Sequence, residues 1–228
     1  LLEEAAGKNC GGAVVFASGY GEVGPEGRER QRELVEAADR LGIAVMGPNC
    51  AGFANFVDGI FAFAFLVEER ERGGNIGMIS QSGQIVLGGL DSPNMGFSHV
   101  ISSGNSCNVK VEDYLDFLVD DEDTKVVAAY MEGVTKPEKL VAAFQKAALK
   151  KKPVVVLKTG RSAKSQELAK SHTGSLSGAD KVLRAVFKRY GVVEAGDLEE
   201  LMSLAAAFSW LEELPKGERC VFMNVSGG

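Results

Sequence analysis

Cysteine, histidine and tryptophan are scarce in this sequence, and long apolar runs are absent. Among its 228 residues are four cysteines, two histidines and one tryptophan. The cysteines are Cys10, Cys50, Cys107 and Cys220. They form no CxxC pair, so their spacing excludes a zinc site or disulfide framework and favours a reducing, cytoplasmic location. The longest apolar run, Ile60–Val67, is too short to cross a bilayer, so we expect no membrane segment.

Basic residues are fewer than acidic ones. The formal net charge is -6 and the isoelectric point is near 5.1. This balance argues against a nucleic-acid surface, and anionic ligands would need backbone amides or a few basic side chains. The residues are 45% apolar and 25% charged, as in ordinary globular proteins, so the chain can bury a sizeable core. We predict no metal site.

Apolar runs with strand and helix spacing alternate along the chain, and this pattern predicts an α/β fold with parallel sheets. Strands are expected at 13–16, 43–46, 75–79, 98–102, 126–131, 154–158 and 192–193. Helices are expected at 26–41, after Gln84, and at 111–119, 138–150, 179–190 and 198–210.

Two α/β units and the start of a third are expected. The first covers residues 1–72 and ends in a linker from about Gly52 to Arg72; the second covers residues 73–213. The chain opens as if in mid-domain, and residues 214–228 read as a truncated third unit. We therefore expect the sequence to be part of a longer chain.

His172 lies in a run of small and hydroxylated residues, 170–178, which is typical of an exposed loop. A lone imidazole on such a loop can accept a group at one site and release it at another. The loop alone favours the alternative of an ordinary surface histidine, so the decision depends on the rest of the chain.

Three polar motifs lie at strand ends of the second unit. Ser80-Gln81-Ser82-Gly83 joins a strand to a helix, and free amides at a helix N-terminus form an anion site; a plain serine N-cap is the alternative. Glu132 follows the strand 126–131, where it could orient an imidazole or pair with a lysine. Lys158 and Arg161, after the next strand, could hold anions or be solvated.

Other polar residues at strand ends face the predicted crevices of the two sheets. Ser18 and Gly19 follow the first strand, and Asn49 and Cys50 follow the second. Cys50 has no base nearby in sequence, so a small buried apolar residue is the favoured interpretation over a nucleophile. Residues 103–105 follow a strand of the second unit and face the second crevice.

These motifs in this order resemble the NDP-forming acyl-CoA synthetases, a family that includes ADP-forming acetyl-CoA synthetase and is related to succinyl-CoA synthetase. The motifs are Gly47-Pro48-Asn49-Cys50, Ser80-Gln81-Ser82-Gly83, Ser103-Gly104-Asn105, Tyr130-Met131-Glu132-Gly133, Lys158-Thr159-Gly160-Arg161-Ser162 and Ser171-His172-Thr173-Gly174. The resemblance covers nearly the whole chain. It implies a partial Rossmann-like CoA-binding domain followed by a flavodoxin-like, doubly wound parallel-sheet domain.

The resemblance also implies an acid–thiol ligase. Acyl-CoA, phosphate and NDP would be interconverted with carboxylic acid, CoA and NTP through an acyl phosphate and a phosphohistidine. By motif, His172 and Glu132 would be catalytic. The other implied sites are Ser80, Ser82, Gly83 and Gly174 for phosphate, Ser18, Gly19, Asn49 and Cys50 for CoA, and Ser103, Gly104 and Asn105 for substrate. CoA and ATP/ADP with Mg²⁺ are implied as ligands, and an ATP-grasp subunit or domain, in an oligomer, as partner.

The sequence departs from the family in lacking the glycine-rich CoA loop and the ATP-grasp part, so we expect the fragment alone to be inactive. Residues 91–95 also interrupt a helix that is usually longer in the family. The alternative is a regulatory module that senses acyl-CoA or nucleotide in a larger protein, such as a protein lysine acetyltransferase. A dehydrogenase is disfavoured because no GxGxxG follows the first strand.

Overall fold

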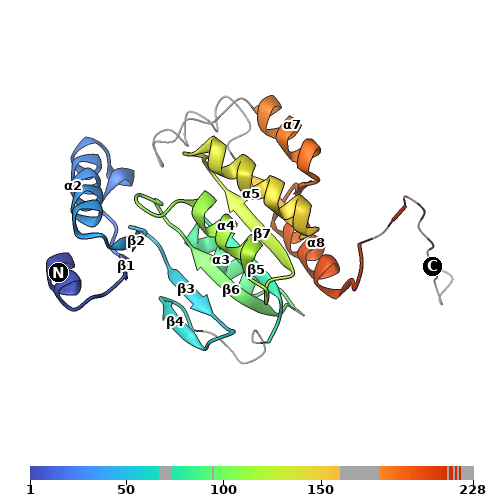
Figure 1. Ribbon diagram of the computed structural model, residues 1–228, viewed down its shortest axis with the longest axis horizontal. Helices are drawn as coiled ribbons and strands as arrows, with labels where there is room; N and C mark the ends of the chain where they lie inside the picture. Colours follow the sequence, from blue (N-terminus) through green and yellow to red (C-terminus); the bar gives the residue numbers. More distant parts are fainter. Residues whose placement is uncertain are drawn as a thin grey trace.

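The fold is built on two sheets, one of two strands and one of seven (Figure 1). The computed structural model describes residues 1–66, 73–93, 95–159, 180–214, 216–217, 219 and 221. The large sheet has the order β4-β3-β6-β5-β7-β8-β9. Its strands β5 to β9 run parallel to one another, whereas β3 and β4 are antiparallel additions at one edge. The α/β class and mostly parallel sheet expected from the sequence are confirmed.

The small sheet belongs to a strand–helix–strand unit at the N-terminal end of the chain. Its elements are α1 (Leu2–Gly7), β1 (Gly12–Val14), the 3₁₀ turn η1 (Gly21–Val23), α2 (Pro25–Leu41) and β2 (Ala44–Met46). Strands β1 and β2 pair in parallel, as a helical crossover requires. Proline at the first turn of α2 and left-handed Gly42 after its last residue set the bounds of that helix.

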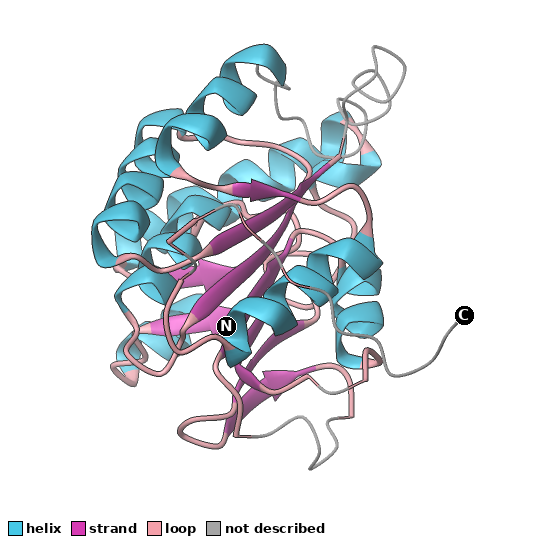
Figure 2. Cartoon of the chain, turned by 90° about the vertical axis from the view of Figure 1, so that its right-hand side faces the viewer, coloured by secondary structure: helices cyan, strands magenta, loops and turns pink. Residues whose placement is uncertain are grey.

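The large unit alternates strands and helices. Its elements are β5 (Ile76–Ser80), α3 (Gly83–Leu90), β6 (Phe97–Ser102), α4 (Val111–Asp120), β7 (Val126–Met131), α5 (Pro137–Lys150), β8 (Val154–Lys158), α7 (Asp180–Tyr190), β9 (Val193–Glu194) and α8 (Leu198–Trp210). Helices α4, α5 and α7 cover one face of the sheet, and α3 and α8 cover the other. Figure 2 shows helices on both sides of the strands.

Alternate residues of each central strand enter different cores. In β7, Val127 and Ala129 pack with α4 and α5, whereas Val126 and Ala128 pack with α3 and α8. All four are buried because both faces of the sheet are covered. Burying a side chain the size of valine contributes roughly 1.5–3 kcal/mol, so these two cores hold the strands and their carboxyl ends in place.

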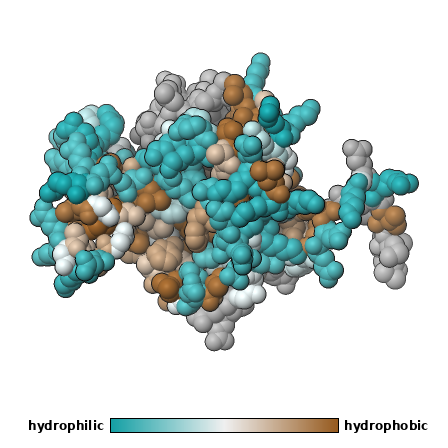
Figure 3. Space-filling model, viewed as in Figure 1, coloured by the Kyte–Doolittle hydropathy of each residue, from teal (hydrophilic) through white to brown (hydrophobic). Residues whose placement is uncertain are grey.

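The predicted linker is wrong for residues 52–63. These residues form a hairpin, β3 (Gly52–Asn55) and β4 (Ile60–Phe63), and β3 pairs with β6 from Gly52 opposite Ser102 to Asn55 opposite His99. Ala54 is fully buried in the sheet, whereas edge strand β4 exposes apolar side chains at the lower rim in Figure 3. The two strands of the hairpin have only four residues each, too few for a clear alternation of apolar and polar residues in the sequence. The proposed domain boundaries stay a prediction.

The loop 103–110, between β6 and α4, joins the two units. Its backbone amides at Asn105, Cys107 and Val109 donate to the carbonyls of Pro48 (2.9 Å), Gly47 (2.9 Å) and Val45 (3.2 Å). The loop therefore lies alongside β2 and its following turn. This pairing brings Asn49 and Cys50, expected at one crevice, close to residues 103–105, expected at the other.

The predicted third unit, 214–228, lies mostly outside the described residues. Within the described part of the chain, no helix combines the length and the apolar run that a bilayer crossing requires.

Candidate active site at the carboxyl edge of the sheet

The carboxyl ends of β5, β6, β7 and β8 meet at one edge of the large sheet because these strands are parallel. Strand β3 runs the other way, so the residues that precede it arrive at the same edge. A cavity of about 390 Å³ opens there. It is lined by Asn49, Cys50, Ala51, Ala64, Phe65, Gln81, Ser82, Gly83, Gln84, Gly104, Asn105 and Glu132.

Seven of the predicted site residues share this cavity. They are Asn49, Cys50, Ser82, Gly83, Gly104, Asn105 and Glu132. They come from both units and from sequence positions more than eighty residues apart, and strand direction together with the pairing of loop 103–110 and the turn after β2 collects them at one edge. The predicted catalytic His172 and the phosphate-binding Gly174 lie outside the described residues.

Four predicted residues do not line the cavity. The buried Ser80 hydroxyl accepts from the Ser82 amide (3.0 Å) and donates to the Ser82 carbonyl (2.7 Å), so it shapes the turn. Ser103 is also buried, and its hydroxyl donates to the Ser80 carbonyl at 3.3 Å. Ser18, which is exposed, and Gly19 lie in the loop after β1. Their assigned roles stay predictions.

The N-terminus of α3 supplies amide donors to the cavity. Ser82 is the N-cap residue in an extended conformation, and its side chain makes no capping hydrogen bond. The first amides of a helix have no partner within it and carry the positive end of the helix dipole. Ser82 and Gly83 line the cavity, so the helix start lies where the sequence predicts an anion site, and that role stays a prediction.

Glu132 follows β7 and is held by Gln81. The Gln81 side-chain oxygen accepts from the backbone amides of Glu132 (2.6 Å) and Gly133 (3.0 Å). Burial raises the pKa of the neighbouring Tyr130 phenol, and the negative charge of Glu132 raises it further. The position of Glu132 is thus tied to the turn that starts α3.

Lys158, which the sequence suggested could bind an anion, binds backbone carbonyls instead. It is buried, and its ammonium donates to the backbone carbonyl of Glu132 at 2.8 Å and to that of Thr159. A buried ammonium with backbone acceptors stabilises local structure. Lys158 therefore supports the Glu132 loop from the β8 side.

Cys50, Asn49 and Asn105 also line the cavity. The Cys50 thiol is half-buried and donates to the Val15 carbonyl at 3.4 Å, and burial raises its pKa. It is therefore poorly suited to act as a thiolate nucleophile. The side-chain amide of Asn49 donates to the Asn105 side-chain oxygen at 3.3 Å, which joins the two units at the cavity rim.

Five lining residues were not singled out from the sequence: Ala51, Ala64, Phe65, Gln81 and Gln84. Gln81 lies within the Ser80-Gln81-Ser82-Gly83 motif and Gln84 follows it, so their place in the sequence was a usable signal. Phe65 and Ala64 belong to the longest apolar run and reach the cavity only because the β3–β4 hairpin folds back onto the sheet.

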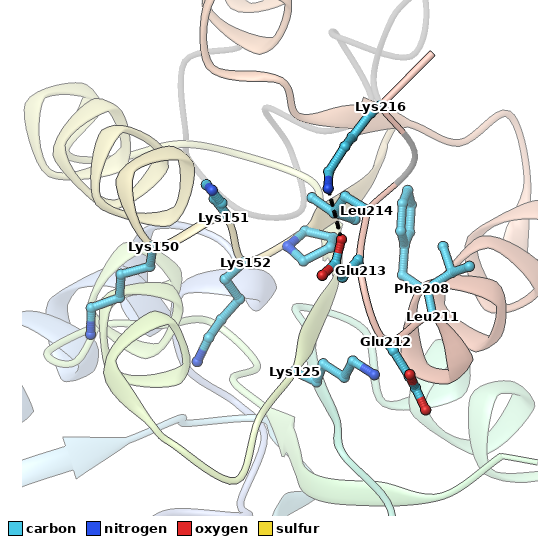
Figure 4. Close-up of a pocket in the computed structure, with 11 residues that line it drawn as sticks. Lys125, Lys150, Lys151, Lys152, Phe208, Leu211, Glu212, Glu213, Leu214 and Lys216 are labelled. Carbon is cyan, nitrogen blue, oxygen red and sulfur yellow. Dashed lines mark ion pairs between the residues drawn. The ribbon is translucent and has the colours of Figure 1, made fainter. Parts of the chain in front are cut away.

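A larger cavity, about 680 Å³, lies at the opposite edge, near the amino ends of β7 and β8 (Figure 4). Several lysines line it, but the ammonium groups of three of them already have partners. Lys125 donates to the Ser209 carbonyl (3.1 Å), Lys152 to the Leu118 carbonyl (3.0 Å), and Lys216 pairs with Glu213 at 3.0 Å. Ligands of parallel sheets bind at the carboxyl edge, so the smaller cavity is the candidate site.

No group of three or more acidic, histidine or cysteine side chains suited to a metal ion occurs among the described residues. Among the residues of the cavity, the amide donors fit an anionic ligand, whereas the carboxylate of Glu132 would repel an anion and suits a basic group such as an imidazole.

Residues 73–208 match the family model of the succinyl-CoA ligase like flavodoxin domain. The chain belongs to this family. The resemblance to the NDP-forming acyl-CoA synthetases is confirmed by individual relatives. Over the whole chain it is 37% identical to subunit alpha of the ADP-forming acetate–CoA ligase II of Pyrococcus furiosus, covering 49% of that protein. It is 40% identical to the ADP-forming acetate–CoA ligase I of Archaeoglobus fulgidus, covering 33%.

A solved structure agrees with these sequence matches. The acetyl-coenzyme A synthetase 1 of Candidatus Korarchaeum cryptofilum, in complex with phosphate and ADP, aligns with a TM-score of 0.85 at 30% identity. The alignment covers 96% of this chain and 47% of that one. The chain thus spans about a third to a half of the length of these family members.

Proposed function

We propose that this chain forms the acyl- and phosphoryl-transfer core of an NDP-forming acyl-CoA synthetase, an acid–thiol ligase. The observation that carries the proposal is the shared cavity, where the amide-rich start of α3 and the Glu132 carboxylate lie beside Asn49 and Cys50 of the first unit. An anion site, a carboxylate able to orient an imidazole and a wall from the CoA-binding unit are the parts that the reaction needs.

The chemistry proceeds in three transfers, one of the acyl group and two of the phosphoryl group. An oxygen of inorganic phosphate attacks the thioester carbonyl, the carbon–sulfur bond breaks, and the thiolate of CoA leaves and takes up a proton. A nitrogen of His172 then attacks the phosphorus of the acyl phosphate, and the carboxylate leaves as the phosphorus–oxygen bond breaks. The phosphohistidine finally passes its phosphoryl group to NDP.

The described residues supply stabilisation and orientation. The Gly83 amide at the start of α3 stabilises the charge on the phosphoryl oxygens without having to reorganise, and the Ser82 hydroxyl, which makes no capping hydrogen bond, donates to the same oxygens. Glu132 orients the imidazole of His172 and favours the tautomer that attacks phosphorus. CoA lies along Ser18, Gly19, Asn49 and Cys50, and the acyl group faces the loop 103–105.

The nucleotide is held elsewhere. An ATP-grasp subunit or domain binds ATP or ADP with Mg²⁺, whose charge offsets that of the phosphates, and accepts the phosphoryl group from His172. The complete enzyme is a cytoplasmic oligomer. A regulatory acyl-CoA sensor gains no support, because the two relatives cited above are named as acetate–CoA ligases and the solved structure as an acetyl-coenzyme A synthetase.

The test is labelling of the full-length protein with ATP carrying a radioactive γ-phosphate, in the presence of magnesium. Acid-labile label is expected on His172, absent from His172→Ala and reduced in Glu132→Gln. An exposed-carboxylate variant, Glu122→Gln, serves as the matched control and should label normally. Label that persists in His172→Ala rejects the mechanism.

A further inference from the structure

The carboxylate of Glu22 binds two successive backbone amides of the loop after β1, whose Gly19 carbonyl also accepts from the Arg30 side chain at 2.6 Å. One oxygen of Glu22 accepts from the backbone amides of Gly19 (2.5 Å) and Tyr20 (3.1 Å). Successive amides after a strand of this kind can bind a ligand anion. Here the side chain of Glu22 takes that position, so these two amides are committed within the protein.

The other oxygen of Glu22 connects this loop to the cavity. It accepts from the side-chain amide of Asn105 at 2.5 Å. The same amide group donates to the Gln31 side-chain oxygen at 3.0 Å, and the Asn105 oxygen accepts from Asn49 at 3.3 Å. Asn105 lines the cavity, so Glu22 ties the loop of the first unit to the wall of the site.

The charge of Glu22 suits this arrangement. Burial acts to raise its pKa, but the hydrogen bonds from Asn105 and from the backbone amides outweigh burial and lower the pKa. The ionised carboxylate accepts all three hydrogen bonds, whereas a protonated one would lose an acceptor position facing a donor.

We propose that Glu22 is a positioning residue for CoA. Its carboxylate fixes the predicted CoA-binding loop, residues 17–20, against Asn105. It thereby sets the spacing between this loop and the cavity that Glu132 lines. The inference rests on the proposed function. It assigns Asn105 a role in positioning, since both ends of its carboxamide already have protein partners.

Asn108, which lies in the loop 103–110 with Asn105, provides a matched control. Asn108 donates to Asp39 at 2.9 Å, and its side-chain oxygen accepts from the Val45 amide at 2.9 Å. This pair also joins the loop 103–110 to the first unit, but Asn108 does not line the cavity. A variant at Asn108 therefore weakens the contact between loop 103–110 and the first unit without disturbing loop 17–20.

The experiment measures steady-state kinetics and thermal stability of the full-length protein, together with labelling of His172 by ATP. In Glu22→Gln the new amide faces the amide of Asn105, donor against donor. We expect KM for CoA to rise about tenfold, the equivalent of one lost charge-assisted hydrogen bond, with little change in labelling by ATP. The double variant Glu22→Gln with Asn105→Asp places a donor opposite an acceptor and should recover part of the loss. Asn108→Asp should lower the melting temperature and leave KM for CoA unchanged.

Three results would overturn the inference. One is an unchanged KM for CoA in Glu22→Gln. Another is an equal rise in KM in Asn108→Asp, which would show that any loosening of the contact between loop 103–110 and the first unit has this effect. The third is the absence of CoA-dependent turnover in the unmodified protein, which defeats the proposed function before any variant is made. If Glu22→Gln does not fold, Glu22→Asp keeps the charge but shortens its reach and serves in its place.

Discussion

The side-chain oxygen of Gln81 accepts hydrogen bonds from the backbone amide of Glu132 at 2.6 Å and from the next amide, that of Gly133, at 3.0 Å. Gln81 belongs to the turn that starts α3, and Glu132 belongs to the loop after β7. One carboxamide thus fixes the backbone of Glu132 relative to the predicted anion site, although the two residues are 51 positions apart in sequence.

Replacing Gln81 tests this link. In Gln81→Leu both amides lose their acceptor, and each such loss costs about 1–3 kcal/mol when water cannot replace it. We expect phosphorylation of His172 to slow by about tenfold or more, as for a displaced catalytic group. Gln145→Leu, on the exposed face of α5, is the control and should label at the normal rate. Equal rates in both variants would contradict the assigned role.

Glu112 binds the loop that follows β7, and we expect it to contribute to the free energy of unfolding. It is fully buried, and its carboxylate accepts from the amides of Thr135 (2.7 Å) and Lys136 (2.9 Å). Glu112→Leu should lower the free energy of unfolding by about 2–5 kcal/mol, because two amides lose a charged acceptor. Urea denaturation measures this, with the exposed Glu122→Leu as control. A loss below about 0.5 kcal/mol, the usual size of a surface effect, would refute the claim.

Two glycines at the cavity should respond differently to alanine. A Cβ on Gly83 would meet only ordinary contacts, 3.8 Å from the Ala51 Cβ and 3.9 Å from the Ser102 hydroxyl. A Cβ on Gly104, which has a φ of +55°, would lie 2.4 Å from the carbonyl oxygens of Asn49 and Pro48. We expect Gly104→Ala to cost about 2 kcal/mol or more in stability, and Gly83→Ala to keep its melting temperature but label more weakly because a methyl group crowds the helix start. Calorimetry and labelling on both variants separate the two effects.

His99 should make the fold sensitive to acid. Burial lowers its pKa, against the opposing effects of Asp121 and the nearby carboxylates of Asp58 and Asp123. The folded chain therefore binds a proton less readily than the unfolded chain, whose histidine has a pKa of about 6.5. Stability contributed by neutral His99 is present above that value and is lost as pH falls below it, toward the lower folded pKa.

The measurement for His99 is urea unfolding at about pH 7.5 and about pH 5.5, on either side of the unfolded histidine pKa. The loss of stability between these conditions should be smaller in His99→Leu than in the unmodified chain. An equal loss in both would assign the acid sensitivity to other groups.

Cys50 should be unreactive despite its place in the cavity. Burial raises its pKa, so little thiolate exists at neutral pH. With iodoacetamide, mass spectrometry should find the exposed Cys10 alkylated well before Cys50. Cys50→Ala should keep His172 labelling within about threefold, since small buried apolar residues replace one another at modest cost. Faster alkylation of Cys50 than of Cys10 would point to an activated thiol.

The sequence predicted the central strands well because their pattern is unambiguous. Strands β7 and β8 were expected at 126–131 and 154–158, the bounds that the structure has. Continuous apolar runs of this length between polar turns fit only strands buried on both faces. The same reasoning places Glu132 and Ser82 at one edge, because the carboxyl ends of parallel strands must meet.

The parts that the sequence did not reveal depend on long-range contacts. The hairpin β3–β4 has strands of four residues, and its assignment rests on pairing with β6, some 45 residues away. The Gln81 and Glu22 hydrogen bonds involve backbone amides or residues far along the chain, so no local pattern marks them. The two buried serines, Ser80 and Ser103, look like ligand donors in sequence but bond to the protein itself.

The most direct test of the central claim uses no nucleotide. The full-length protein is incubated with radioactive inorganic phosphate and an acyl-CoA that it turns over, and the label is located by peptide mapping. The account predicts label on His172, formed together with free CoA and carboxylate, and lost in His172→Ala. Acyl-CoA cleavage that proceeds in His172→Ala with label on another residue would contradict the account.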